Sequence, residues 1–225
     1  MEAKRLQELY RHRFAHEEQA RNALWAVLCR DFFSRWVPTN ATVLDLAAGH
    51  CEFVNHIEAA RRIAVDLNPD VVQRANPGVE SIVARSDELT EIADASIDRV
   101  FISNFFEHVE RSVILSTLIE VRRVLKDDGR LLVLQPNIRY CSRDYWMFFD
   151  HITPVDDRAL AEAFDAAGFE VEVSIPRFLP YTTKSSLPAA PRLVALYLKV
   201  PLAWRLLGGQ AFMVGRPVGD REPER

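Results

Sequence analysis

Cysteine is scarce in this sequence, and basic residues are not in excess. The three cysteines are widely spaced, so they form neither a metal-binding pattern nor an even-numbered disulfide framework. The 32 acidic residues outnumber the 28 basic ones, and the net charge of −4 argues against a dedicated nucleic-acid-binding protein. No apolar run reaches the roughly 20 residues that a membrane-spanning helix requires.

An export signal is also lacking. Charged residues follow Met1 at once, whereas a secretory signal has an apolar core. We therefore expect a cytoplasmic protein, with a membrane-peripheral location as the alternative. At 225 residues the chain is long enough to form one domain with its own core.

A strand–turn–helix pattern begins at Thr42. Apolar β-formers surround Asp45, small residues surround Gly49, and a helical run follows. Small side chains let the backbone approach a ligand, and a helix start presents free N–H groups. A second apolar run ends in Asp66, about 20 residues later, where an acid suits hydrogen bonding to a ribose. The pattern predicts a nucleotide-type cofactor site.

The loop of this pattern distinguishes between two cofactor classes. Ala47, Gly49 and Cys51 fall on a G-x-G-x-G register, and Asp45 stands just ahead of them. A carboxylate there suits a cationic amine and would repel the pyrophosphate of a dinucleotide. The loop thus resembles motif I of the class I S-adenosylmethionine (SAM) dependent methyltransferases, whose first acid holds the methionine end of the cofactor. Ala47 and Cys51 depart from the motif, and since alanine at positive φ is costly, we expect a relaxed turn or weakened cofactor binding.

The resemblance extends from about residue 42 to about 175. Asp87 falls where these enzymes place the acid that reads the adenine amine. Phe106-Glu107-His108-Val109 is similar to the "EH" step after their fourth strand, and residues 124–134 look like their turn into strand five. The resemblance implies SAM as the cofactor. The residues it implies as cofactor-binding are Asp45, Ala47, Gly49, Asp66, Leu67, Ser86, Asp87 and Asn104.

Strand and helix patterns alternate from residue 42 onward, which predicts an α/β fold with a doubly wound, mostly parallel sheet. Expected strands are 42–46, 62–66, 80–84, 97–103, 130–135 and 169–175. Expected helices are 51–60, 69–75, 110–125 and 156–167. The resemblance adds a seventh strand at 210–215, antiparallel and placed between strands five and six. Ligands on such sheets bind beyond the carboxyl ends of the strands, so we expect the acids to share one rim.

Four segments are expected along the chain. Residues 1–40 would form a helical lid, in which Tyr10, Arg13 and Phe14 are candidates to cover the cofactor. The alternative is an amphipathic helix packed on the sheet. A methyltransferase domain would occupy 41–215, with an insertion at 176–209 over the active-site rim, and 216–225 would be a flexible tail.

The insertion differs from the rest of the chain in charge. Residues 176–207 contain five cations and no acid. Its first half mixes cations and aromatics, which favours contact with an anionic substrate through Arg177, Tyr181 and Lys184. Residues 191–207 are mostly apolar and suit contact with a membrane surface; intramolecular packing and a homodimer interface are the alternatives.

Two histidines are placed for catalysis. Methyl transfer from SAM is an in-line displacement, and a hydroxyl acceptor needs a base to take its proton. His108 follows the fourth strand. His151 lies in an aromatic–Asp–His passage ahead of a helix that we expect Thr153 to cap. Asn137, Tyr140 and Tyr145 follow strand five and would wall the acceptor pocket.

The acceptor class follows in part from missing motifs. No cluster of carboxylates for a metal ion is evident, and no Asn-Pro-Pro-Tyr follows strand four, which speaks against methylation of DNA bases or protein glutamine. We predict methyl transfer to a small-molecule or lipid/glycan-linked acceptor at a hydroxyl oxygen, without a metal and without nucleic acid. The alternatives are N- or C-methylation of a specialised metabolite, or a non-catalytic binding protein with the same fold.

Overall fold

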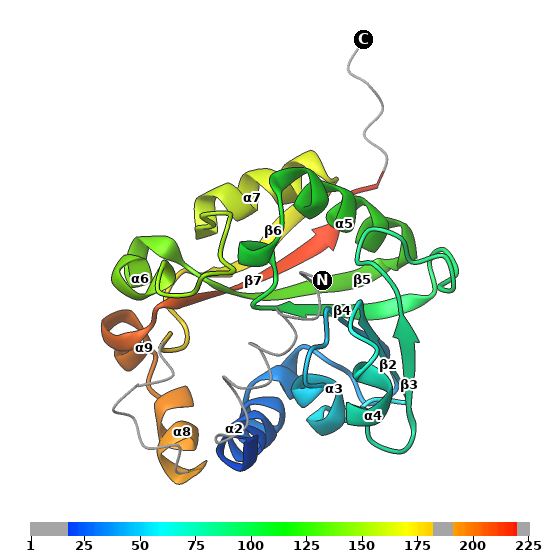
Figure 1. The fold of residues 1–225 in the computed structure, drawn as a ribbon. Coiled ribbons are helices and arrows are strands. Elements are labelled where there is room, and N and C mark those ends of the chain that lie inside the picture. Colours follow the sequence, from blue (N-terminus) through cyan, green and yellow to red (C-terminus); the bar gives the residue numbers. More distant parts are fainter. Residues whose placement is uncertain (1–17, 182–190, 220–225) are drawn as a thin grey trace.

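A seven-stranded sheet forms the centre of the computed structural model, which describes residues 18–181 and 191–219 (Figure 1). The strand order is β3-β2-β1-β4-β5-β7-β6. The first five strands in this order, β3-β2-β1-β4-β5, pair in parallel, and β7 is antiparallel to both β5 and β6. The doubly wound, mostly parallel sheet is therefore confirmed. The strands are β1 (Thr42–Leu46), β2 (Arg61–Asp66), β3 (Val79–Val83), β4 (Ile97–Ser103), β5 (Leu125–Pro136), β6 (Phe169–Ile175) and β7 (Gln210–Pro217).

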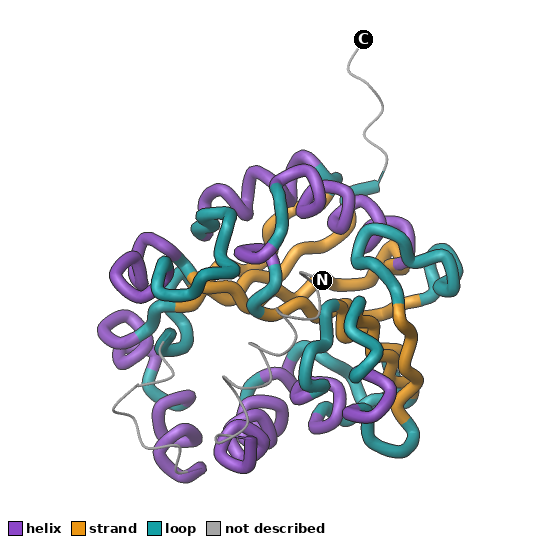
Figure 2. The backbone as a smooth tube through the Cα atoms, viewed as in Figure 1, coloured by secondary structure: helices purple, strands orange, loops and turns teal. Residues whose placement is uncertain are grey.

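Helices cover both faces of the sheet (Figures 1 and 2). The α-helices are α2 (Glu18–Asp31), α3 (Glu52–His56), α4 (Val71–Arg74), α5 (Arg111–Val124), α6 (Ile138–Tyr145), α7 (Asp157–Ala166), α8 (Pro191–Leu198) and α9 (Pro201–Leu207). Two short 3₁₀ helices are η1 (Phe33–Arg35) and η2 (Phe106–His108). None of the helices within the described ranges is long and apolar enough to cross a bilayer.

Alternate residues of the strands pack into two separate hydrophobic cores, one on each face of the sheet. Leu44 and Leu46 of β1 pack in the cluster that includes residues of α5 and α7. Val43, the residue before Leu44, packs in the opposite cluster with residues of α2, α8 and α9. This alternation follows from the two-residue period of a strand, and it explains why the central strands are apolar on both faces.

Aromatic rings dominate the second cluster. Phe53 of α3 and Phe101 of β4 stack with ring centroids 3.8 Å apart, and Phe33 packs edge-on against both of them. Trp25 of α2 packs edge-on against Phe101 of β4, so α2 packs on the sheet, as in the alternative interpretation of the N-terminal segment. The proposed lid residues Tyr10, Arg13 and Phe14 lie outside the described residues, as does Lys184.

Strand β5 is longer than its predicted range. It begins at Leu125 and runs through the Asp127-Asp128-Gly129 sequence that we expected to be a turn. Its register against β4 jumps from Ile97↔Leu125 to Arg99↔Arg130, so the extra residues are absorbed as an irregularity inside the strand.

Element ends differ from prediction at three further places. α3 ends at His56 instead of residue 60. β7 continues to Pro217, beyond the expected domain end at 215, so residues 216 and 217 belong to the sheet and not to a tail. Asp156, not Thr153, caps α7: its Oδ1 accepts hydrogen bonds from the backbone N–H groups of Arg158 and Ala159.

Candidate active site

The loop after β1 adopts the conformation of a glycine-rich loop without its glycines. Ala47, Gly49 and Cys51 have φ values of 58°, 52° and 58°. The expectation of a relaxed turn was therefore wrong. A non-glycine residue in this region costs on the order of 1–3 kcal/mol, and Asn104, after β4, is a further case with φ of 47°. Backbone strain is thus concentrated at neighbouring strand ends, as is common at ligand sites.

Asp45 is buried beneath this loop. Its side chain is 3% exposed, and Oδ2 accepts a hydrogen bond of 3.2 Å from the backbone N–H of Val54. Burial raises the pKa of Asp45 well above its usual range, and the Val54 N–H offsets only part of that effect. A cationic amino group bound here would restore the charged form of the carboxylate, which fits the methionine end of SAM.

Asp66 links the tips of β1 and β2. Its Oδ2 accepts a hydrogen bond of 2.7 Å from the Gly49 N–H, and its Oδ1 accepts one of 2.7 Å from the Asn68 N–H. Each carboxylate oxygen has a further lone pair, so ribose hydroxyls can still donate to it. Leu67, next in the chain, is 68% exposed and offers an apolar surface at the same rim.

The remaining predicted cofactor residues have partners within the protein. Arg85 binds both carboxylate oxygens of Asp87 at 2.9 Å, and this hydrogen bonding lowers the pKa of Asp87. Ser86 shares a hydrogen bond of 2.7 Å with Thr117. Asn104 is exposed and donates its backbone N–H to the Leu134 carbonyl at 2.9 Å. An adenine amino group would therefore share Asp87 with Arg85.

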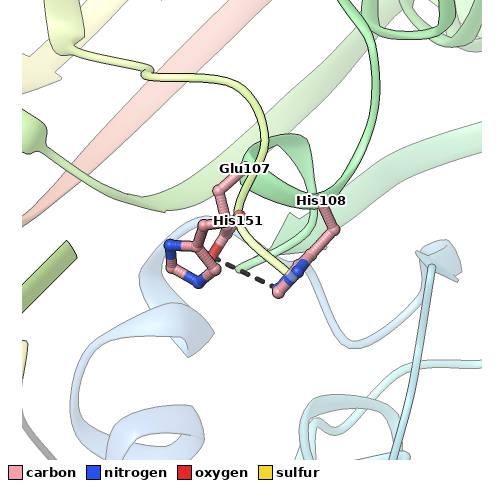
Figure 3. A group of neighbouring side chains, drawn as sticks. All are labelled: Glu107, His108 and His151. Carbon is pink, nitrogen blue, oxygen red and sulfur yellow. Dashed lines mark ion pairs between the residues drawn. The ribbon is translucent and has the colours of Figure 1, made fainter. Parts of the chain in front are cut away.

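Two catalytic candidates that are far apart in the sequence meet in space (Figure 3). The rings of His108 and His151 lie edge to face, with centroids 4.8 Å apart. Glu107 points toward His108, and its Oε1 lies 3.8 Å from His108 Nε2. The contact arises because the Glu107 carbonyl accepts hydrogen bonds from the backbone N–H groups of Ile152 and Thr153, which fixes the loop of His151 to η2.

The neighbours of His108 define the roles of its two ring nitrogens. Nδ1 lies 3.2 Å from the carbonyl oxygen of Asp150 and 3.4 Å from its carboxylate Oδ2. Both are acceptors, so Nδ1 carries the proton, and Nε2 is left as the proton-accepting nitrogen. The Asp–His passage seen in the sequence therefore brings Asp150 into contact with His108.

Glu107 is a site residue that sequence reasoning did not single out. It is 1% exposed, and its Oε2 accepts a hydrogen bond of 2.8 Å from Gln135 Nε2. Burial raises the pKa of Glu107, while the nearby His108 and Gln135 lower it. Its place in the "EH" step was the available signal, but its burial and its partner on β5 could not be read from that step.

Glu107, His108 and His151 also form a group that could hold a metal ion. Their ligand atoms lie within 4.8 Å of one another. Metal bonds to nitrogen and oxygen of about 2.0–2.2 Å place two ligand atoms of one ion at most about 4.4 Å apart. The group would therefore have to contract to bind an ion.

The predicted acceptor-wall residues divide into two sets. Asn137 is fully buried, and its side chain binds Asp157 and the Pro176 carbonyl. Tyr145 is also fully buried, and its hydroxyl donates to the Thr153 carbonyl at 2.5 Å. These two residues support the framework instead of lining a pocket.

The second set lies nearer the surface. Tyr140 is partly exposed and stacks under Arg177, with the guanidinium 4.8 Å from the ring centroid. Tyr181 packs edge-on against Phe148, with ring centroids 6.1 Å apart, and Phe148 in turn contacts His151. Tyr140, a predicted wall residue, therefore remains available to an acceptor, as do Arg177 and Tyr181, which were predicted to contact an anionic substrate.

Comparison with known proteins identifies the domain and its fold. Residues 44–133, from β1 to β5, match the family model of the methyltransferase domain. The chain therefore contains a methyltransferase domain, and its fold is that of the class I SAM-dependent enzymes. SAM is accordingly its cofactor. That Asp45, Gly49 and Asp66 hold it stays a prediction. No curated protein matches the sequence of this methyltransferase.

Solved structures share the whole fold of the methyltransferase. A chain in the Haloferax volcanii complex of the Trm112 methyltransferase activator with a methyltransferase is 19% identical, with a TM-score of 0.67 over 96% of this chain and 97% of that one. A SAM-dependent methyltransferase from Archaeoglobus fulgidus is 21% identical, with a TM-score of 0.66 over 90% and 98%. The 1,6-didemethyltoxoflavin-N1-methyltransferase of Burkholderia thailandensis, solved with its substrate and S-adenosylhomocysteine (SAH), is 16% identical, with a TM-score of 0.61 over 96% and 87%.

Proposed function

We propose that this methyltransferase methylates a hydroxyl oxygen of a small-molecule or lipid/glycan-linked acceptor, with His108 as the proton acceptor. The observation that carries the proposal is the orientation of His108 by Asp150, which leaves Nε2 free to take a proton. We also propose a cytoplasmic location. The support is that Cys29, Cys51 and Cys141 are buried and form no disulfide, and cell fractionation tests it.

The residues of the site divide the work of such a reaction. Bound SAM supplies an electrophilic methyl group, and Asp45 and Asp66 would fix its two ends. The acceptor hydroxyl gives its proton to His108 Nε2 as its oxygen attacks. Asp150, hydrogen-bonded to Nδ1, stabilises the imidazolium that results. The carboxylate of Glu107, 3.8 Å from Nε2, adds to that stabilisation when it is ionised.

His151 has a different role in this proposal. It is 8% exposed and is packed against the rings of Tyr145 and Phe148. Such a buried ring is suited to position His108 and to contact the acceptor, and less suited to exchange protons with solvent. Loss of His151 should therefore weaken acceptor binding as well as turnover.

An amine acceptor is the second candidate, because the Burkholderia relative is an N1-methyltransferase. The shared fold does not choose between oxygen and nitrogen. A neutral amine attacks without first losing a proton, so its methylation depends less on a base. The effect of removing His108 therefore separates the two candidates.

The experiment follows methyl incorporation from labelled SAM into a panel of phenols, amines, free sugars and lipid-linked sugars. For the accepted compound, His108→Asn should lower kcat about 100-fold to 10,000-fold, with SAH affinity unchanged, and the residual rate should rise with pH as the acceptor ionises. Asp150→Asn should lower kcat less. His56→Asn, which removes a contact with Asn22 on α2, is the matched control.

Two outcomes would contradict the proposal. One is incorporation only into amines. The other is a His108→Asn variant that keeps its rate within about threefold of the starting protein while binding SAH normally.

A further inference from the structure

The insertion presents an apolar face to solvent. Helices α8 and α9 and the short connection between them form it, and six of their apolar side chains are between 41% and 70% exposed. These residues, called here the insertion face, are Leu193, Leu196, Val200, Leu202, Leu206 and Leu207. Leu193 and Leu196 are three residues apart on α8, and Leu202 and Leu206 are four apart on α9, so each pair lies on one face of its helix. Solvent-facing stripes of a soluble helix are normally polar, so this one calls for a partner.

The opposite side of both helices is anchored to the protein. The Tyr197 hydroxyl donates to the Phe178 carbonyl at 2.5 Å, and the Trp204 indole N–H donates to the Tyr197 carbonyl at 2.8 Å. Both side chains belong to the aromatic core that also contains residues of α2. The insertion therefore already packs intramolecularly on one side, and among residues 18–181 and 191–219 nothing covers the insertion face.

The charges within residues 191–207 are all of one sign. Arg192, Lys199 and Arg205 are exposed, and residues 191–207 contain no acid. The acid next to them on α2 is Asp31, whose carboxylate is already bound by Arg30 at 2.7 and 2.8 Å. A surface that combines exposed leucines with cations is complementary to a layer that is apolar within and anionic at its boundary.

We propose that the insertion face lies on the surface of an anionic lipid membrane. Helices of 8 and 7 residues rise only about 12 and 10 Å, which is too short to cross a bilayer but sufficient to lie along its interface. In that position the leucines enter the boundary of the acyl chains, and the three cations contact anionic head groups.

The insertion face is connected to the acceptor side of the active site. The Arg177 guanidinium donates to the carbonyl oxygens of Leu206 and Gly208 at the end of α9. The same guanidinium stacks on Tyr140 of α6. A membrane-bound enzyme would thus have the wall residues Tyr140 and Arg177 next to the lipid surface. The docking itself does not depend on which atom of the acceptor is methylated.

The test is flotation of the purified protein with two kinds of vesicle. One is phosphatidylcholine alone, and the other contains about 30 mol% of the anionic lipid phosphatidylglycerol. We expect binding to the anionic vesicles that weakens at high salt. The variant Leu202→Asn with Leu206→Asn should reduce it at least about tenfold, because both side chains leave the interface. Replacing Arg192, Lys199 and Arg205 by glutamine should reduce it about tenfold to a hundredfold on anionic vesicles only.

The matched control is Ile119→Asn, which changes an equally exposed apolar residue on α5, across the sheet from the insertion. It should float as the starting protein does. SAH titration of every variant confirms that the fold and the cofactor site are intact, so a failed acceptor assay leaves this result unaffected.

Three results would overturn the proposal. The first is no flotation with either vesicle. The second is flotation that the leucine variant does not reduce. The third is a concentration-dependent dimer in sedimentation that the leucine variant abolishes, without vesicle binding, which would assign the insertion face to a second copy of the chain.

Discussion

Glu107 is a carboxylic acid held where water cannot solvate its charge. Its pKa is raised by burial, so the native state favours the protonated form more than the unfolded state does. The resulting stabilisation is fully present below the unfolded pKa of about 4.3 and is lost as the pH rises through the native pKa. The enzyme therefore carries a residue that makes it less stable as the pH rises toward neutrality.

The prediction is that Glu107→Gln gains stability relative to the starting protein as the pH rises from about 4 to 8. The gain at neutral pH should be about 1–3 kcal/mol, since glutamine keeps an acceptor for Gln135 without a buried charge. Urea unfolding across this pH range measures it.

Glu80→Gln is a control for which the pH dependence of stability should have the opposite sign. Glu80 is exposed and bound by Arg61, and this hydrogen bond lowers the pKa of Glu80. Its stabilisation is present above the unfolded pKa and is lost as the pH falls, and it should be small because the pair is exposed. A Glu107→Gln variant whose relative stability does not change with pH would contradict the assignment of a buried acid.

Single residues at the strand ends were predictable from the sequence, and their pairings were not. Asp45 and Asp66 could be placed because each ends an apolar run, and the ends of parallel strands meet at one rim. The contact of Asp150 with His108 joins two loops that are 42 residues apart in the chain. No periodicity or spacing encodes such a contact, and it depends on how the loop after α6 docks on η2.

At the scale of elements, the loop after β1 shows how a structure can keep a conformation that its residues disfavour. The sequence indicated that Ala47 and Cys51 would oppose the turn. It did not indicate the hydrogen bonds that hold the loop: Ala48 N–H to the Val65 carbonyl, Cys51 N–H to the Ala48 carbonyl, and Gly49 N–H to Asp66. For strand β5 the error was the reverse. The residues Asp127-Asp128-Gly129 favour a turn, but the structure accommodates them within the strand.

The end of α9 is sterically tight and yields a second prediction. A Cβ at Gly208 would lie 2.6 Å from the Arg177 carbonyl carbon, 2.7 Å from the Trp204 carbonyl oxygen and 2.8 Å from the Phe178 nitrogen. All three are backbone atoms that cannot move aside cheaply. Gly208→Ala should therefore lower the free energy of unfolding by about 1–3 kcal/mol, measured by urea denaturation.

Gly219→Ala is the matched control for that substitution. No atom lies within 4 Å of a Cβ built at Gly219, so this change should be nearly neutral. Equal stabilities of the two alanine variants would mean that α9 shifts freely and is not fixed by its contact with Arg177.

At the scale of the whole molecule, cofactor binding should stabilise the fold. SAH at about 100 times its dissociation constant adds about 2.7 kcal/mol, which for a domain of this size raises the melting temperature by about 5–10 °C. Asp66→Ala should abolish the rise, because Asp66 holds the Gly49 loop and faces the ribose site. Thermal scans with and without SAH measure it.

The control for this prediction is Glu170→Ala, which removes an exposed ion pair with Arg216 at the edge of the sheet. It should leave the SAH-induced rise intact. If the SAH-induced rise persists in Asp66→Ala, Asp66 does not make the ribose contact, and another residue must make it.

The order of the strands has a consequence for biosynthesis. β6 lies at the edge of the sheet and pairs only with β7, which is made later in the chain yet stands between β5 and β6. During translation β6 therefore leaves the ribosome without a partner, while β5 exposes an apolar edge that nothing yet covers. Chaperones that bind extended apolar segments would meet the nascent chain in this interval. Completion of the sheet must wait until residue 217 has emerged.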